Sequence, residues 1–384
     1  MTRTCPPHPR LAGRPRGWVL GAAVLLGGCV ASPLPDPQSR MQAVPNQLEY
    51  LEDPAAGPVR FLVVGDTQVP RSGQERAARL RRALYDSLAA ALADSALVVH
   101  LGDVVDNGSR AEQWARFDAE IGWERLTQEQ RRRFVPIPGN HDYKTHWWDW
   151  GGGDLSLYFR RFAHLQHRRY YFFTRGASAF VCMDAGRNGI RKVFGEGWEN
   201  GREEQEEWLQ RAVLPYLEGR SHSLRRIFLF VHKPGWVTPV ERRNDDTVRM
   251  LRRFDDFNRD HGYPFEIYSF SGHIHTFSHI RRDHNGDGQG EVEQFTSGGG
   301  GGEQVGREYF GRVGRPADLD AYRLGQYRQQ ARGEGLDGQV FDAVRRDNTH
   351  FGYLEVEAAE RVRVRYHRFQ PQDGGFRVDY EYVR

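Results

Sequence analysis

The chain has little cysteine. Three of its 384 residues are cysteines, and Cys5 and Cys29 lie in the N-terminal segment, ahead of any predicted domain. Cys182 lies in the apolar run 179–183 and has no second cysteine to pair with once that segment is removed. We therefore exclude an intramolecular disulfide in the mature chain and expect Cys182 to be a small buried side chain.

Lysine is also scarce, and the net charge is small. The lysines are Lys144, Lys192 and Lys233, so arginine supplies nearly all the positive charge. The formal charge is +3, and it becomes −1 when the four arginines of a removable leader are left out (Arg3, Arg10, Arg14 and Arg16). A nearly neutral protein has no strong attraction for polyanions, so we expect no nucleic-acid partner.

The N-terminal apolar run is too short for a stable membrane anchor. Residues 18–26 follow a basic stretch and fit the hydrophobic region of a secretory signal peptide. The run ends in Leu-Gly-Gly-Cys at 26–29, which resembles a bacterial lipobox. We expect residues 1–28 to be removed and Cys29 to be acylated as the new N-terminus. The alternative is an ordinary signal peptide cut near Gly28 or Ala31, which leaves a free protein.

The residues after Cys29 predict how the domain is attached. Residues 29–58 are rich in proline and are typical of an extended tether. Val30, rather than Asp, favours sorting to the outer membrane by resemblance. The expected location is the bacterial cell envelope, as an exported outer-membrane lipoprotein facing the periplasm. The lipid anchor is then its contact with the membrane.

Five short polar islands follow apolar, β-rich runs. They are Gly-Asp-Thr-Gln at 65–68, Gly-Asp-Val-Val-Asp at 102–106, Gly-Asn-His-Asp at 139–142, Val-His-Lys-Pro at 231–234 and Gly-His-Ile-His at 272–275. Predicted helices at 74–94 and 109–122, the second capped by Ser109, separate the first three islands. This β-α-β-α-β order places each island at the carboxyl end of a strand, where open α/β sheets bind ligands.

The remaining pattern predicts a second sheet and one continuous domain over 59–384. Further strands are expected at 170–174, 179–184, 227–231, 265–270, 353–357 and 362–369, with helices at 202–217 and 244–260 and a hairpin at 279–297. Residues 303–347 are polar and predict an excursion with a helix near 318–331. The segment 283–294 imitates the start of a calcium loop, but Gln294 replaces the required glutamate, so a hairpin turn is the better interpretation.

The islands supply the side chains that two metal ions need. Asp103 would bridge both ions, because a carboxylate has two oxygens. Asp66 and His275 would hold one ion, and Asn140, His232 and His273 the other. His141 would lie beside the ions and act as the catalytic acid, oriented by Asp142 or Asp106. Two cations roughly 3.5–4 Å apart can activate water and neutralise a phosphoester, so this set predicts phosphoester hydrolysis.

This ordered set resembles the calcineurin-like metallophosphoesterase superfamily. The resemblance implies an α/β fold, a four-layer α/β/β/α sandwich of two mixed sheets flanked by helices. It also implies two divalent or trivalent ions (Mn, Fe or Zn) and a bridging hydroxide. Gln68 stands where the family pattern Asp-x-His has histidine, so it is a weak ligand, a hydrogen-bond donor to bound water, or leaves the position open. Branches resembling purple acid phosphatases also lack that histidine, but Asp106 replaces their metal-binding tyrosine, so we treat Asp106 as a residue behind the ligands.

These features predict a metal-dependent phosphoesterase acting on a small-molecule phosphomonoester or phosphodiester. Two alternatives remain open from the sequence. One is a nuclease, against which the missing basic groove argues. The other is a non-catalytic envelope binding protein that keeps the fold.

Overall fold

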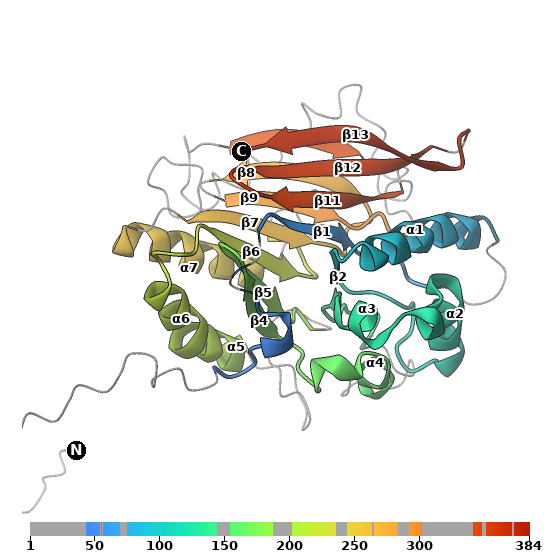
Figure 1. Ribbon diagram of the computed structural model, residues 1–384, viewed down its shortest axis with the longest axis horizontal. Coiled ribbons are helices and arrows are strands. Elements are labelled where there is room, and N and C mark those ends of the chain that lie inside the picture. Colours follow the sequence, from blue (N-terminus) through green and yellow to red (C-terminus); the bar gives the residue numbers. More distant parts are fainter. Residues whose placement is uncertain are drawn as a thin grey trace, which may run out of the picture. The chain divides into compact units, whose positions relative to one another are not determined.

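Two mixed β-sheets pack face to face in the computed structural model (Figure 1). It describes residues 44–53, 55, 57–69, 75–143, 154–186, 202–235, 244–262, 265–282, 292–301, 341–347, 351–370 and 372–384. These residues belong to one compact unit that spans 43–384. The predicted lipid-attachment residue Cys29, the segment 283–291 and the predicted helix near 318–331 lie outside the described residues. None of the described helices is both long and apolar enough to cross a bilayer.

The six-stranded sheet contains the predicted β-α-β-α-β unit. Its strand order is β13-β12-β11-β1-β2-β3, in which β1, β2 and β3 are parallel and β11 is antiparallel to β1. The strands are β1 (Val59–Val64), β2 (Leu97–His100), β3 (Phe134–Pro136), β11 (Gly352–Ala358), β12 (Val362–Gln370) and β13 (Gly375–Val383). Helix α1 (Glu75–Ala93) connects β1 to β2, and α2 (Ala111–Ile121) lies between β2 and β3. The carboxyl ends of the three parallel strands therefore meet at one edge.

The seven-stranded sheet places two more strand ends at that edge. Its order is β10-β8-β9-β7-β6-β5-β4, and β5, β6 and β7 are parallel neighbours. The strands are β4 (Tyr171–Arg175), β5 (Ser178–Met183), β6 (Arg226–Val231), β7 (Glu266–Ser271), β8 (Phe277–Arg282), β9 (Val292–Ser297) and β10 (Phe341–Asp347). Strands β8 and β9 pair antiparallel, as the predicted hairpin requires.

Aromatic side chains fill the space between the sheets. The Phe61 ring of β1 makes edge-on contacts with Phe180 and Phe228 at centroid distances of 5.2 and 5.0 Å. A second apolar cluster covers the other face of the seven-stranded sheet, where Leu209 and Phe254 pack against strand residues. They come from the helical segment made of α5 (Arg202–Trp208), the π-helical turn η5 (Leu209–Val213) and α6 (Leu214–Gly219), and from α7 (Asp245–His261). Helices α1 and α2 pack on the six-stranded sheet, so the predicted four-layer sandwich is confirmed.

Several short helices precede or follow β3 in the chain. They are η3 (Trp123–Arg125), α3 (Gln128–Arg132), α4 (Ser156–Arg161) and η4 (Ala163–Leu165). Thr127 begins α3 with a capping box, because it exchanges hydrogen bonds with Gln130 in both directions. The sequence analysis did not predict these elements, since each is shorter than the window in which helical periodicity is visible.

The folded unit begins before the predicted boundary at residue 59. Leu48 is fully buried, and its backbone N–H donates to Phe172 O of β4 at 2.9 Å. Glu52 accepts hydrogen bonds from the backbone and the hydroxyl of Thr174. The helix η2 (Glu49–Leu51) lies between these contacts. The last part of the predicted tether is therefore packed against β4.

Two further expectations differ in detail. Ser109 is not the N-cap of α2, which begins at Ala111 without a side-chain cap. The Ser109 hydroxyl and backbone N–H instead donate to Asn107 Oδ1, which closes a turn ahead of the helix. Strand β10 occupies the end of the predicted excursion 303–347. Cys182 is fully buried and unpaired, as predicted, and burial raises the pKa of its thiol.

Candidate metal centre

The loops after β1, β2, β3, β6 and β7 converge through hydrogen bonds that their backbone N–H groups donate. The Asp66 N–H donates to Gly102 O, and the His141 N–H donates to Asp103 Oδ1 at 2.7 Å. The Gly272 N–H donates to His232 O, and the His273 N–H donates to Asp66 Oδ2 at 2.8 Å. These bonds join all five predicted islands, which lie up to 207 positions apart in the sequence.

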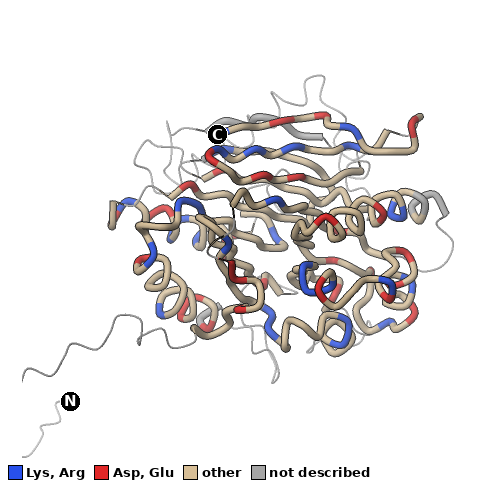
Figure 2. The backbone as a smooth tube through the Cα atoms, viewed as in Figure 1, with Lys and Arg blue, Asp and Glu red and all other residues tan. Residues whose placement is uncertain are grey.

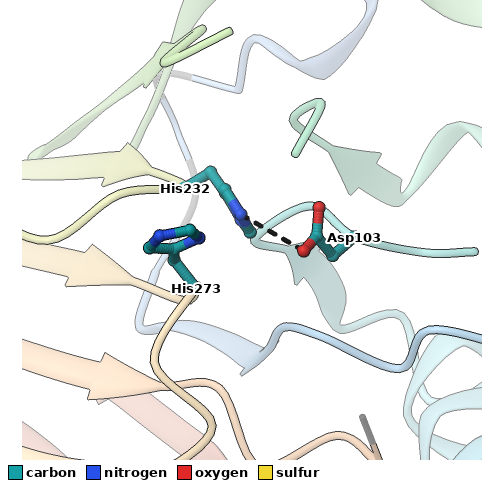
Figure 3. A group of neighbouring side chains, drawn as sticks. All are labelled: Asp103, His232 and His273. Carbon is teal, nitrogen blue, oxygen red and sulfur yellow. Dashed lines mark ion pairs between the residues drawn. The ribbon is translucent and has the colours of Figure 1, made fainter. Parts of the chain in front are cut away.

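Three side chains at the centre can hold one metal ion. Asp103, His232 and His273 each offer a ligand atom, and the three atoms lie within 4.8 Å of one another. Figure 3 shows that they come from three different strand ends and that His232 lies nearest to Asp103. His232 Nε2 is 3.4 Å from Asp103 Oδ2, and the rings of His232 and His273 are 5.1 Å apart at an angle of 72°.

His232 is oriented with its Nε2 toward the centre. Its Nδ1 donates to Leu101 O at 2.7 Å, which fixes the ring and leaves Nε2 facing Asp103. Asn140 Oδ1 is 3.0 Å from the same Nε2. A histidine that binds metal usually donates its other nitrogen to a carbonyl or carboxylate in this way. The structure therefore brings Asn140 to the same side as the central three residues.

Asp66 and His275 form a second group beside the first. His275 Nε2 is 3.5 Å from Asp66 Oδ1. Asp66 is fully buried, and its Oδ1 accepts no hydrogen bond from the described residues. A buried carboxylate oxygen without a donor is unfavourable unless a cation lies against it.

The backbone is strained at several of these positions. Asp66, Asp103 and His273 have φ values of 60°, 56° and 64°, a left-handed conformation that non-glycine residues rarely adopt. Gly139 allows the loops to approach, because a Cβ there would lie 2.3 Å from the Asp103 N and Oδ1 atoms. Such strain persists where surrounding contacts impose it, and it is common at functional sites.

His141 and Asp142 have different roles, although they are adjacent. His141 Nδ1 lies 2.9 Å from Asp106 O and 3.1 Å from Asp106 Oδ1, and its Nε2 is 3.9 Å from Asp103 Oδ2. Asp106 is therefore the residue that orients His141. Asp142 is buried and accepts hydrogen bonds from the backbone N–H groups of Gly139, Asp103, Val104 and Val105. It holds two of the loops together rather than orienting His141.

Gln68 contacts the central carboxylate. Its Nε2 donates to Asp103 Oδ2 at 3.0 Å, and its side chain is almost fully buried. The sequence left three roles open for this residue. In the structure its amide N–H group, which cannot bind a metal, faces the residue predicted to bridge the ions.

The charges of the centre depend on one another. Burial alone would raise the pKa of Asp103, but His232 and His141 hold that pKa well below its ordinary value. Burial likewise opposes the charge on His232, but Asp103 and Asp66 raise the pKa of His232 to about 9. Burial raises the pKa of Asp66 despite the nearby histidines. Without a metal, a proton on His232 therefore supplies the positive charge that the buried carboxylates require.

The residues present fit divalent metal ions. Carboxylate, amide and imidazole donors together suit Mn, Fe or Zn. The Oδ1 of Asp66, which accepts no hydrogen bond from the described residues, and the raised pKa of His232 both mark places where a cation's charge would be favourable.

The sequence analysis missed Asp184, which lies behind the central residues. Asp184, directly after β5, is fully buried and accepts a hydrogen bond from the Tyr143 hydroxyl at 2.5 Å. Lys233 lies within electrostatic range of both Asp103 and Asp184, and burial lowers its pKa to about 8 against their influence. Asp184 follows an apolar run just as the five islands do, so the same signal could have identified it.

Comparisons with known proteins relate this chain to others. The sequence profile described as calcineurin-like phosphoesterase matches residues 59–277. No curated protein matches the chain. One solved structure, described as "GAP50 the anchor in the inner membrane complex of Plasmodium", is similar with 11% sequence identity and a TM-score of 0.49, covering 85% of this chain and 88% of that chain.

The profile match covers more than half of the chain. It begins with the first residue of β1 and ends with the first residue of β8, so it includes all five loops of the centre. By this match the chain belongs to the calcineurin-like phosphoesterase family.

Proposed function

We propose that the protein hydrolyses phosphomonoesters or phosphodiesters with two metal ions. The observation that carries the proposal is the convergence of Asp103, His232 and His273 from three separate strand ends in a family of phosphoesterases. Asp66 and His275 would hold one ion, Asn140, His232 and His273 the other, and Asp103 both. Bound ions would supply an activated water and neutralise the charge of the phosphate.

His141 is suited to protonate the leaving oxygen. Asp106 fixes its Nδ1 side, so Nε2 is directed toward the loop of Asp103. Its side chain is 21% exposed, which leaves room for a substrate to reach it. A positioned histidine that donates a proton in the transition state typically contributes about 10²–10⁴-fold to the rate. Lys233 adds a positive charge that would attract the phosphate.

The proposal is tested by turnover and metal content together. Purified protein is assayed with p-nitrophenyl phosphate and bis-p-nitrophenyl phosphate in Mn²⁺, beside Asp103→Asn and the surface variant Asp373→Asn. We expect Asp103→Asn to lose more than about 100-fold in kcat, because even residues behind a metal's ligands cost 10–100-fold. Asp373→Asn should match the wild type. Metal-dependent turnover that survives Asp103→Asn would contradict the proposal.

The same preparations, assayed also with single-stranded DNA and RNA, separate the alternatives. A non-catalytic binding protein would show neither turnover nor bound metal. A nuclease would cleave single-stranded DNA or RNA faster than the small diester. The ratio of the two p-nitrophenyl substrates would assign monoester or diester preference.

We also propose that the protein is exported and held at the outer membrane through an acyl chain on Cys29. Support comes from the Leu-Gly-Gly-Cys motif at 26–29 and from the short apolar run at 18–26 that precedes it. Cys29→Ser should release the protein from the membrane fraction and abolish palmitate labelling. Membrane retention of an unlabelled Cys29→Ser protein would refute the anchor.

A further inference from the structure

The two proposed metal positions have unequal sets of protein ligands. The position near His232 has three side chains of its own, Asn140, His232 and His273, in addition to Asp103. The position near His275 has two, Asp66 and His275. A metal held by fewer protein donors is generally bound less tightly. The difference in metal affinity between the two positions therefore depends on whether a further side chain joins Asp66 and His275 as a ligand.

Gln68 is the side chain placed to complete it, but its amide is turned away. Its Nε2 donates to Asp103 Oδ2, so its N–H group, not its oxygen, faces the shared carboxylate. Reversing the amide would place the oxygen against a carboxylate oxygen, which is repulsive. The backbone N–H of Gln68 also donates to Asp103 O, and its φ of 37° is strained. These contacts hold Gln68 as a partner of Asp103 rather than as a ligand.

We propose that the protein binds its two metal ions with unequal affinity and that Gln68 sets the difference. The ion beside Asp66 and His275 binds more weakly than the ion beside Asn140, His232 and His273. Gln68 sets the difference because its amide N–H is held on Asp103, so this residue supplies no metal ligand to the position beside Asp66 and His275. This inference rests on the proposed function, since it requires that the centre binds metal.

The test measures metal binding without activity. Apo-protein is titrated with Mn²⁺ by calorimetry, and bound metal is counted after dialysis at graded free Mn²⁺. We expect the wild type to bind one ion tightly and a second at least about tenfold more weakly, in two resolved steps. Gln68→His supplies an imidazole donor and should narrow this gap by about 10–100-fold. Gln68→Met, similar in size but without a strong donor atom, should leave the position beside Asp66 and His275 weak.

The outcomes distinguish this inference from the proposed function. Two equal binding steps in the wild type would overturn the inference and leave the metal centre intact. A gap unchanged by Gln68→His would overturn the role of Gln68. No metal bound by any variant would overturn the proposed function, and the inference with it. The wild-type titration alone tests whether the two ions bind with unequal affinity, so this test does not depend on correct folding of the Gln68→His protein.

A separate observation concerns an arginine-lined cavity away from the metal centre. The cavity, of about 430 Å³, lies between η2, η3, α3, α4 and η4. Arg131 and Arg132 precede the first residue of β3, whereas Asn140 follows the carboxyl end of that strand. The cavity is therefore at the opposite end of β3 from the metal centre. Its lining includes Arg131, Arg132, Arg160, Arg161, His164 and Tyr50.

Acidic side chains compensate only part of the positive charge of the four arginines that line this cavity. Arg161 forms ion pairs with Asp118 and Glu124, and Arg131 forms one with Glu124. Arg132 stacks 5.6 Å from the Tyr50 ring centroid. Neither Arg132 nor Arg160 has an acidic partner within 4.0 Å among the described residues. Two exposed guanidinium groups, of which Arg132 lies over Tyr50, therefore line one cavity of a size that suits a small ligand.

We infer that this cavity binds a phosphate-bearing anion. Guanidinium groups bind phosphate through paired, charge-assisted hydrogen bonds, and Arg132 and Arg160 are the two that remain available. The phosphate would belong either to a soluble phosphorylated molecule or to the headgroup of an anionic phospholipid. Tyr50 belongs to the segment that leads from the proposed anchor, which places the cavity near the start of the folded unit.

The experiment distinguishes the two sources. Metal-free protein with Cys29→Ser, which cannot be acylated, is titrated with pyrophosphate and mixed with vesicles of phosphatidylglycerol or phosphatidylcholine. Arg132→Gln/Arg160→Gln is compared with the matched surface double variant Arg82→Gln/Arg361→Gln. A loss of pyrophosphate affinity of tenfold or more in the first variant alone would support a soluble ligand. A loss of binding to phosphatidylglycerol vesicles alone would support a headgroup. Equal behaviour of the two double variants would overturn the inference.

Discussion

At the scale of single residues, substitutions of His141 and Asp106 should lower catalysis without lowering metal binding. His141 Nε2 lies 3.9 Å from Asp103 Oδ2, and His141 is not among the proposed metal ligands. We expect His141→Ala to lower kcat by about 10²–10⁴-fold, since it removes the proton donor, while the metal content stays unchanged. Asp106→Asn should cost less, about tenfold, because the Asp106 carbonyl still holds Nδ1. Steady-state kinetics and metal analysis of the same preparations would check this. Loss of metal in His141→Ala would show instead that His141 is a ligand.

Replacement of Asp142 should lower the stability of the fold rather than cause a specific catalytic defect. Its carboxylate accepts four backbone N–H groups from the loops after β2 and β3. Asp142→Ala leaves these buried donors unpaired, and we expect about 3–5 kcal/mol lower free energy of unfolding. Urea unfolding of the variant and of Asp86→Ala, an exposed position on α1, would measure the difference. A cost below about 1 kcal/mol would mean that water replaces the carboxylate.

At the scale of elements, a buried polar cluster joins the C-terminal strand to the other sheet. Glu293 of β9 accepts from His279 of β8 at 2.7 Å and from the Tyr382 hydroxyl of β13 at 2.6 Å. His279 also contacts the Tyr380 hydroxyl at 2.8 Å and stacks on Phe295. Burial opposes the charge of Glu293, but His279 and Tyr382 hold its pKa below the ordinary value. The cluster therefore stabilises β13, which forms an edge of its sheet.

Tyr382→Phe tests this connection with the loss of one hydroxyl. A hydrogen bond to a buried charged group contributes about 1.5–3 kcal/mol, so we expect a loss of that size in the free energy of unfolding. Tyr216→Phe is the matched control, because its hydroxyl lies at a longer 3.4 Å from Glu52. The control should change stability by no more than about 0.5 kcal/mol. Equal effects in chemical denaturation would show that the cluster does not bind β13.

Sequence patterns at this scale identify apolar elements better than polar ones. Helix α1 and strands β1, β2, β6 and β7 were predicted because their apolar residues are continuous or helically spaced. Strands β10 and β13 were not, since edge strands such as Phe341–Asp347 carry many polar residues. The candidate ligands follow the buried strands and were therefore predictable as a set. The amide direction of Gln68 and the four bonds of Asp142 depend on loops about 35 to 40 residues apart, which no local pattern encodes.

At the scale of the whole molecule, a ladder of ion pairs across neighbouring strands connects β1 to the C-terminal strands β11, β12 and β13. Figure 2 shows basic segments along β12 between acidic segments on β11 and β13. Arg365 pairs with Glu355 of β11 and Glu381 of β13. Arg60 of β1 pairs with Glu355 at 2.8 Å. Cross-strand pairs of opposite charge stabilise neighbouring strands, so the ladder links four strands of the six-stranded sheet.

The pKa of Glu355 determines one way in which the stability of this sheet should depend on pH. Its hydrogen bond with His367, followed by Arg60, lowers the pKa of Glu355 from 4.5 to about 2 although burial opposes the shift. A depressed pKa stabilises the folded state fully above pH 4.5, and this contribution is lost as the pH falls toward 2. Solvent screens these surface charges, so we expect roughly 1–2 kcal/mol. Urea unfolding at pH 6 and pH 3 should therefore show a difference between wild type and Glu355→Gln that shrinks at pH 3. A constant difference would mean that Glu355 stabilises the sheet by packing rather than by its charge.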